Sequence, residues 1–255
     1  MRHIRRLLKR YLPHPIAFAV LWSQYHMRRK LNKLKFAGGE YYCPICDYQI
    51  SSYLISGGTA SCPICESSER HRLDWLFLRD KTNLLDQKPK RMLHVAPELF
   101  LVSLLKKTRN LDYISVDLED PRAMKKMDIT NIKFPDNFFD CIYCSHVLEH
   151  IMDDRKAISE LYRVCKPKGW ALLQVPITSA TTLENPMITE PEERKKVFGL
   201  ENHVRRCGLD YVERLSEVGF NVTTFSANEL MTMEDFVHMG ILQTNRFIFY
   251  CVKPK

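Results

Sequence analysis

The chain has 255 residues, of which 45% are hydrophobic and 27% are charged. This is the composition of a globular protein with an ordinary core, and it excludes a fibrous or broadly disordered chain. The nine cysteines are an odd number in a chain long enough to build its own core, which argues against a secreted disulfide scaffold. We therefore expect a reducing, cytoplasmic compartment.

The net charge of +8 is concentrated at the N-terminus. Residues 1–35 contain ten Lys or Arg residues and no Asp or Glu, which leaves 28 basic and 30 acidic residues in the rest of the chain. The basic character therefore belongs to an N-terminal arm. The longest apolar run in this arm, residues 16–22, is far shorter than the roughly 20 residues of a membrane-spanning helix.

Two helices are predicted in the arm. Ile4, Leu7, Leu8 and Tyr11 recur at helical spacing among basic residues, and a second helix follows over about 15–33. Two interpretations remain open. The arm packs on its own domain, or it contacts anionic groups, either lipid headgroups or nucleic acid phosphates. Aromatic residues in the second helix favour an anionic membrane surface, and hence peripheral membrane association, over nucleic acid.

The next segment carries two matched pairs of cysteines. Cys43 and Cys46 form one Cys-Pro-Ile-Cys motif, and Cys62 and Cys65 form a second one after fifteen residues. A two-residue spacer lets both thiolates of a pair reach one ion, and two pairs complete a tetrahedron around Zn²⁺ with no open position. The sequence therefore predicts a structural zinc site, where the metal folds the module and takes no part in catalysis. Free cysteines or two redox pairs are the alternative.

The zinc module leads directly into a predicted helix. Ser67 or Ser68 is expected to cap this helix, and the basic run 70–72 follows. These basic residues either pack the module onto the main domain or meet an anionic substrate group. The predicted organisation is a basic helical arm at 1–39, a four-cysteine zinc module at 40–72 and one larger domain at 73–255.

From about residue 88 the pattern alternates between strands and helices. Strands in an alternating β and α sequence form a mostly parallel sheet with helices on both faces, which is an α/β, Rossmann-like architecture. Cys141 and Cys144 share the two-residue spacing, but a strand sends them to opposite faces, so they are not expected to share a metal. The expected strands are 91–95, 113–117, 139–145, 170–175, 221–225 and 246–252, and the expected helices are 98–108, 153–165 and 208–218.

Residues 88–252 resemble the class I, seven-stranded methyltransferases of the group called type 11. Three stretches carry the resemblance: Asp-Ile-Thr at 128–130, the Pro-Asp-x-x-Phe-Asp turn at 135–140, and Ser-His-Val-Leu-Glu-His at 145–150. The segment 161–169 is similar to the Arg-x-Leu-Lys-Pro-Gly-Gly signature of that group, with two substitutions. The resemblance implies a seven-stranded sheet and S-adenosylmethionine as cofactor.

The resemblance also implies the cofactor residues. Asp117 closes the second strand, where a carboxylate accepts both ribose hydroxyls, and Asp128, followed by Ile129, matches the acid that contacts adenine. Ser145 and His146 end the fourth strand, beside the sulfonium and its methyl group. A nucleoside cofactor on such a sheet lies across the carboxyl ends of the strands.

The loop after the first strand departs from the family pattern. It carries Ala96, Pro97 and Glu98 where the family has an acid and two glycines. Without glycine we expect that the backbone cannot form the usual left-handed turn. Pro97 suits the first turn of a helix and Glu98 its N-terminus, and Glu98 is expected to meet the positive charge of the cofactor.

Methyl transfer is an in-line displacement that requires alignment and, for some acceptors, a base. His146 and His203 are the candidate bases, and Arg205 and Arg206 are candidates for holding an anionic substrate. His150 is interpreted as a packing residue, and no metal is predicted beside it. The polar segment 178–196 is expected to form a lid.

The sequence thus predicts a methyltransferase that acts on oxygen or nitrogen of a small-molecule or glycan-type substrate. A nucleic-acid-binding protein or RNA methyltransferase is the alternative, with the zinc module and basic arm as the reader. A scaffold that has lost catalysis with its glycine loop is a third interpretation.

Overall fold

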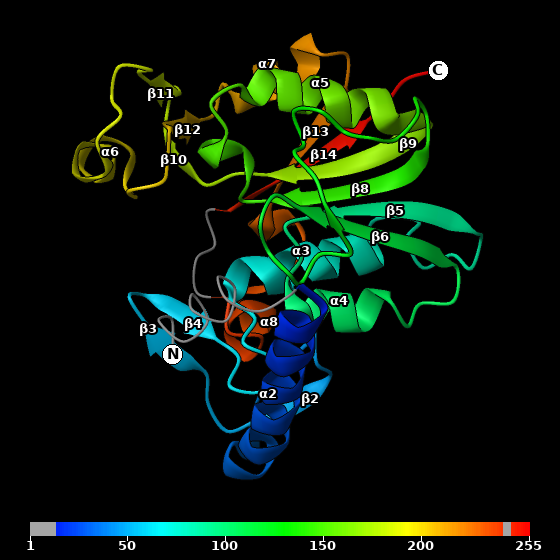
Figure 1. The fold of residues 1–255 in the computed structure, drawn as a ribbon. Helices are drawn as coiled ribbons and strands as arrows, with labels where there is room; N and C mark the ends of the chain where they lie inside the picture. Colours follow the sequence, from blue (N-terminus) through cyan, green and yellow to red (C-terminus); the bar gives the residue numbers. More distant parts are fainter. Residues whose placement is uncertain (1–13, 242–245) are drawn as a thin grey trace.

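The computed structural model describes residues 14–241 and 246–255, so the first predicted helix of the arm lies outside the described residues. A seven-stranded sheet runs through the molecule in the order β13-β14-β9-β8-β5-β6-β7 (Figure 1). All neighbouring pairs are parallel except those of β14, which is antiparallel to β9 and to β13. The strands are β5 (Lys90–Val95), β6 (Leu111–Asp117), β7 (Lys125–Lys126), β8 (Phe139–Ser145), β9 (Cys165–Gln174), β13 (Asn221–Ser226) and β14 (Phe247–Val252). The predicted α/β, seven-stranded fold is confirmed.

Helices cover both faces of this sheet. α5 (Asp154–Val164) and α7 (Tyr211–Glu217) lie on one face, and α3 (Glu69–Asp80), α4 (Leu99–Leu105) and α8 (Met233–His238) lie on the other (Figure 1). The central strands are apolar on both sides, as parallel strands between two helical layers must be. Cys141 and Cys144 are accordingly fully buried in two different cores, one on each side of β8, so they cannot share a metal.

The N-terminal part packs against the zinc-module segment. α2 (His14–Lys35) buries Leu21 and Tyr25, and the Asn32 amide donates to the carbonyl of Pro63 at 2.6 Å. The module consists of two hairpins, β1 (Ala37–Cys43) with β2 (Tyr48–Ile50) and β3 (Leu54–Ser56) with β4 (Thr59–Ser61). The described part of the arm therefore packs on its own protein, and the choice between the two interpretations of the whole arm stays open.

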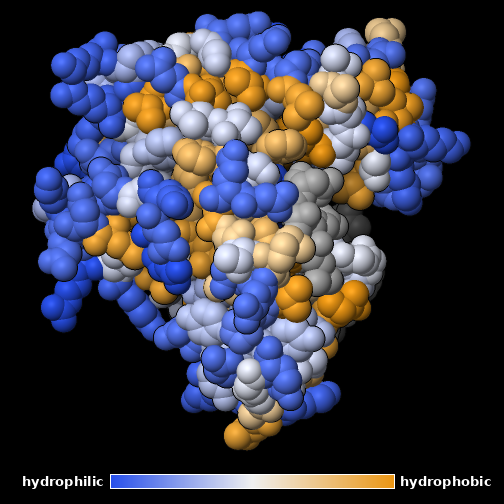
Figure 2. Space-filling view, turned by 180° about the vertical axis from the view of Figure 1, so that it is seen from behind, coloured by the Kyte–Doolittle hydropathy of each residue, from blue (hydrophilic) through white to orange (hydrophobic). Residues whose placement is uncertain are grey.

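The outer side of α2 combines apolar and basic residues. Met27, Leu31 and Leu34 are 62–83% exposed, and Figure 2 shows hydrophobic colour at the lower tip of the molecule. Among the described residues, no helix has the length and apolar character required to cross a bilayer. Contact of the arm with anionic lipid or nucleic acid stays a prediction.

α3 runs across the expected boundary at residue 72, so the module and the larger domain share a helix. This helix buries Leu73, Trp75, Leu76, Phe77 and Leu78, which makes it part of the core beneath the sheet. Ser68 is its N-cap, as predicted.

The expected lid has secondary structure of its own. β10 (Ile177–Ser179), β11 (Leu183–Glu184) and β12 (Arg205–Gly208) form a small sheet in the order β10-β12-β11, and α6 (Pro191–Phe198) lies beside it (Figure 1). The helix predicted at 208–218 therefore starts later, at Tyr211, because residues 205–208 pair as a strand. Two short 3₁₀ helices, η1 (Leu148–His150) and η2 (Ala227–Glu229), follow β8 and β13.

Candidate functional site

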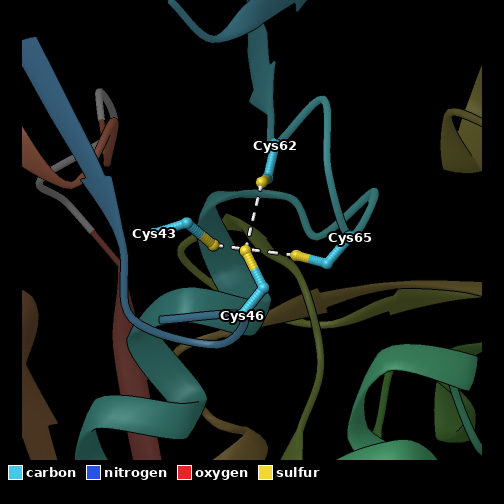
Figure 3. Close-up of side chains that lie close together, drawn as sticks. All are labelled: Cys43, Cys46, Cys62 and Cys65. Atoms are coloured by element: carbon cyan, nitrogen blue, oxygen red, sulfur yellow. Dashed lines mark hydrogen bonds between the residues drawn. The ribbon is translucent and has the colours of Figure 1, made fainter. Parts of the chain in front are cut away.

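The four paired cysteines come together in space (Figure 3). The Sγ atoms of Cys43 and Cys65 are 3.6 Å apart, and those of Cys46 and Cys62 are 3.8 Å apart. A tetrahedron of thiolates with Zn–S bonds of about 2.3 Å has edges of about 3.8 Å. None of the four is in a disulfide, so the cluster fits one Zn²⁺ ion.

The local backbone explains how each pair turns inward. Asp47 and Glu66, which directly follow the second cysteine of each pair, have positive φ angles of 50° and 64°. Each chain segment therefore reverses just after its Cys-x-x-Cys motif. The Ser67 hydroxyl lies 3.1 Å from the Cys65 Sγ, where it can donate to a thiolate.

The predicted cofactor residues follow adjacent strands at the carboxyl edge of the large sheet. The Ala96 N–H donates to Val116 at 2.9 Å, which places Ala96 beside the end of β6, where Asp117 stands. Asp117 pairs in turn with Lys126 at the end of β7, and Asp128 lies two residues further along the chain. Ser145 ends β8, the other neighbour of β5. The structure thus brings this set to one edge.

Asp117 and Asp128 each shape the turn that follows them. Oδ1 of Asp117 accepts backbone N–H groups of Glu119 and Asp120 at 2.8 and 2.6 Å. Oδ1 of Asp128 accepts both the N–H and the hydroxyl of Thr130, each at 2.8 Å. One oxygen of each carboxylate is therefore used within the loop. The Ile129 side chain is buried in the core.

Ala96 corrects the expectation about the glycine-free loop. Its φ angle is +52°, so alanine adopts the left-handed conformation that the family's glycine usually supplies. The backbone turn is formed without glycine, at the steric cost of a Cβ in this region. The hydrogen bond from the Ala96 N–H to the Val116 carbonyl helps to hold the residue there.

Replacing Ala96 by glycine should therefore be neutral or stabilising. The left-handed conformation costs an L-residue roughly 1–2 kcal/mol, and the added freedom of glycine in the unfolded chain offsets about 0.4–1 kcal/mol of the gain. We expect the free energy of unfolding, measured in urea, to stay equal or rise by up to about 1 kcal/mol. Ala157→Gly, near the start of α5 and buried, is the control and should lower it by at least about 1 kcal/mol. Equal losses in both variants would show that the turn does not strain Ala96.

Glu98 lies between two histidines. One carboxylate oxygen is 3.3 Å from Nε2 of His71, and the other is 3.1 Å from Nε2 of His94. Burial alone raises the pKa of Glu98, but the hydrogen bonds from His71 and His94 outweigh it and hold the pKa well below its ordinary value. Glu98 is thus an ionised carboxylate near the cofactor edge, with both oxygens already engaged by protein groups. Its contact with the cofactor stays a prediction.

A buried carboxylate that sequence reasoning missed lies beside this edge. Asp74 of α3 is 2% exposed. Its Oδ2 accepts the hydroxyls of Tyr143 and Ser145 at 2.9 and 3.1 Å, and its Oδ1 accepts the Gln174 amide at 3.1 Å. Asp74 therefore ties α3 to the ends of β8 and β9. The sequence marks Asp74 in one way: it is the single acid in the apolar run of residues 73–78.

A polar cavity of about 690 Å³ opens at this point. The ends of β8 and β9 line it with His146 and Gln174, and Asp74 lies in its wall. The zinc-module side contributes hydroxyl groups and Arg70. Arg246, at the start of β14, brings a second guanidinium. The cavity thus joins the carboxyl edge of the sheet to the segment that carries the cysteines.

His146 faces this cavity, whereas His203 is not among the residues that line it. His146 has a positive φ of 56°, and its Nδ1 lies 3.2 Å from Oε1 of Glu149. The carboxylate can only accept, so the His146 proton sits on Nδ1 and Nε2 is left to accept a proton. His203 instead packs against His150, with ring centroids 4.8 Å apart.

Arg205 does not have the role that was predicted for it. It is 3% exposed, and its guanidinium donates to the carbonyls of Leu148, Ile151 and Met152 at 2.6–2.9 Å and to the Glu184 carboxylate at 3.1 Å. These bonds use its donors to hold β12 against η1, so none is left for an anionic substrate. Arg206 is partly exposed, and its role as a substrate residue stays a prediction.

Comparison with known proteins agrees with this geometry. The family model of the methyltransferase domain, type 11, matches residues 101–173. The ubiquinone/menaquinone biosynthesis C-methyltransferase UbiE of Pectobacterium carotovorum is 48% identical over 42 residues, which are 16% of this chain and 17% of that protein. The enzyme of the same name from Vibrio cholerae is 34% identical over 64 residues, which are 25% of this chain and 20% of that protein.

The chain therefore spans at most a fifth of the length of these curated relatives. A solved S-adenosylmethionine dependent methyltransferase from Mesorhizobium loti has the same fold, with a TM-score of 0.51 and 12% identity, over 72% of this chain and all of that one. The family model thus matches less than a third of the chain, and the solved structure shares the fold of the seven-stranded sheet.

Proposed function

We propose that this protein transfers a methyl group from S-adenosylmethionine to an oxygen or nitrogen atom of a small-molecule or glycan-type acceptor. The observation that carries the proposal is the side-by-side placement of Ala96, Asp117 and Asp128 at the carboxyl edge of the sheet. The acceptor cavity opens at the same edge, over the ends of β8 and β9.

Some residues of the site would bind the cofactor, and His146 would act on the acceptor. The cofactor supplies an electrophilic methyl group when bound. Asp117 has its Oδ2 available to accept the ribose hydroxyls, and Asp128 lies where the family's adenine-contacting acid stands. The left-handed turn at Ala96 lets the backbone approach the ligand. His146 faces the acceptor cavity with an unprotonated Nε2, which suits it to take a proton from the acceptor.

A four-thiolate Zn²⁺ site at Cys43, Cys46, Cys62 and Cys65 is part of the proposal. Its role is structural, because four protein ligands leave no open position. Residues of the adjoining segment, including Arg70, line the acceptor cavity. The zinc module thus shapes the acceptor site and takes no part in the chemistry.

Asp117→Ala should weaken cofactor binding strongly. Each hydrogen bond to a charged acceptor contributes about 1.5–3 kcal/mol, so the loss of both ribose contacts should lower affinity by roughly 100-fold or more. Calorimetric titration of S-adenosylmethionine into the zinc-loaded protein measures this. Asp112→Ala is the control, because Asp112 lies at the opposite end of β6 and its side chain is 63% exposed.

A second variant separates binding from folding. Asp117→Asn keeps an oxygen for the turn to Glu119 and Asp120 but removes the negative charge, so it should also bind cofactor more weakly while melting like the wild type. Unchanged affinity in both variants would contradict the proposed cofactor site.

A further inference from the structure

A second group of metal-ligating side chains lies apart from the cysteines. Glu149 and His150 belong to η1, and His203 lies in the loop between α6 and β12. One ligand atom from each of the three lies within 4.8 Å of the other two. The backbone N–H of Val204 donates to the Glu149 carbonyl at 3.0 Å, which fixes the two segments against each other. Glu149 is 1% exposed and His203 is 9% exposed, so the group is largely shielded from water.

The two histidines are held in the same tautomer. Nδ1 of His150 lies 3.0 Å from the carbonyl of Asn202, and Nδ1 of His203 lies 3.3 Å from the carbonyl of Phe198. A carbonyl oxygen can only accept, so the proton of each neutral ring sits on Nδ1. Both Nε2 atoms are then lone-pair donors. Histidines that bind metals are usually oriented in this way, by a hydrogen bond from the other ring nitrogen to a carbonyl or a carboxylate.

The carboxylate of Glu149 supplies the third ligand. Its Oε1 lies 3.2 Å from Nδ1 of His146, but its buried Oε2 has no hydrogen-bond partner within residues 14–241 and 246–255. Burying a carboxylate oxygen without a partner is costly. One ring nitrogen of each histidine lies within 4.8 Å of a Glu149 carboxylate oxygen, so a cation bound among the three residues would give the carboxylate a partner.

We propose that Glu149, His150 and His203 bind one divalent transition-metal ion through a carboxylate oxygen and two Nε2 atoms. Two imidazoles and one carboxylate form a set that suits Zn²⁺, Fe²⁺, Mn²⁺ or Co²⁺, and three protein ligands leave positions open for water or an oxygen of a ligand. His146 orients Glu149 and also lines the acceptor cavity, so one side chain connects the ion to that cavity. This site is independent of whether the protein transfers methyl groups.

Titration with Co²⁺ distinguishes this site from the cysteine cluster. The protein is first loaded with one Zn²⁺ per chain, and Co²⁺ is then added while binding is followed by calorimetry and by absorption. We expect about one Co²⁺ per chain without the intense thiolate-to-cobalt bands, and one retained Zn²⁺ by elemental analysis. His150→Ala and His203→Ala should each weaken Co²⁺ binding at least about tenfold, because even the loss of an outer partner costs about that much. His238→Ala, on α8, is the control and should bind like the wild type.

Glu149→Gln tests whether a loss of Co²⁺ binding could result from unfolding alone. Gln keeps the side-chain volume and an oxygen for His146, and it removes a buried negative charge. The metal-free variant should therefore melt at or above the wild-type temperature, and Co²⁺ should no longer raise its melting temperature. The proposal is overturned if the zinc-loaded wild type binds no further Co²⁺, if the bound Co²⁺ shows thiolate bands, or if the three variants bind it like His238→Ala.

Discussion

Cys65→Ser should remove zinc from the protein and unfold more than the zinc module. Cys65 is 1% exposed, and α3 begins only four residues later, at Glu69. Binding of a structural Zn²⁺ contributes on the order of 10 kcal/mol to the folding of small zinc modules. Because α3 supplies core residues beneath the large sheet, the loss should spread into the larger domain. We expect the zinc content to fall from one per chain to near zero, and the free energy of unfolding to fall by several kcal/mol.

The control is the same chemical change at a cysteine outside the cluster. Cys251 is fully buried in β14, so Cys251→Ser places a hydroxyl in the core and should lower the free energy of unfolding by about 1–3 kcal/mol. It should retain one Zn²⁺ per chain. Elemental analysis and denaturation of both variants measure the difference. A full zinc content in Cys65→Ser would refute the four-thiolate site.

Local patterns in the sequence predicted most of the fold. The two Cys-x-x-Cys motifs needed only short-range geometry, since each pair lies on one turn of backbone. Six of the seven strands of the large sheet were predicted, because each is an apolar run between turn residues, whereas β7 is only a pair of lysines. The edge at which Asp117 and Asp128 meet follows from parallel topology. These features depend on neighbours within a few residues, or on rules of sheet connection that hold for many sequences.

The features that were missed depend on contacts between distant segments. Asp74 accepts hydrogen bonds from the ends of β8 and β9, which lie about 70 to 100 residues later in the chain, so its role is visible only in the folded protein. Ala96 takes a left-handed φ against its preference, with its N–H bonded to the Val116 carbonyl 20 residues later. Arg205 was predicted to hold a substrate, but its guanidinium donates to three backbone carbonyls of residues 148–152. A charged residue in a sequence does not reveal whether its partner is a ligand or the backbone of the protein itself.

Arg72 is the clearest case of a charge used inside the fold. It is fully buried, and its guanidinium lies 4.3 Å from the Tyr53 ring centroid. Its N–H groups donate to the carbonyls of Ser67 and Ala60 in the zinc module and to those of Met239 and Gly240 after α8, at 2.6–3.0 Å. Of the two interpretations for the basic run 70–72, packing of the module is therefore correct for Arg72.

Arg72→Met should lower the free energy of unfolding by about 3–5 kcal/mol, because it leaves four buried carbonyls without donors. Arg79→Met, on the same helix, is the control: the side chain of Arg79 is 37% exposed and pairs with its neighbour Asp80, so its loss should cost within about 0.5 kcal/mol. Arg72→Lys should fall between them, since a single ammonium cannot reach all four carbonyls. Denaturation followed by tryptophan fluorescence measures the stability of the three variants, and zinc analysis shows whether the metal is retained.

Equal losses for Arg72→Met and Arg79→Met would mean that these carbonyls do not hold the module to the domain. A large loss with zinc retained would show that metal binding and docking of the module are separable, because the four thiolates do not depend on the guanidinium.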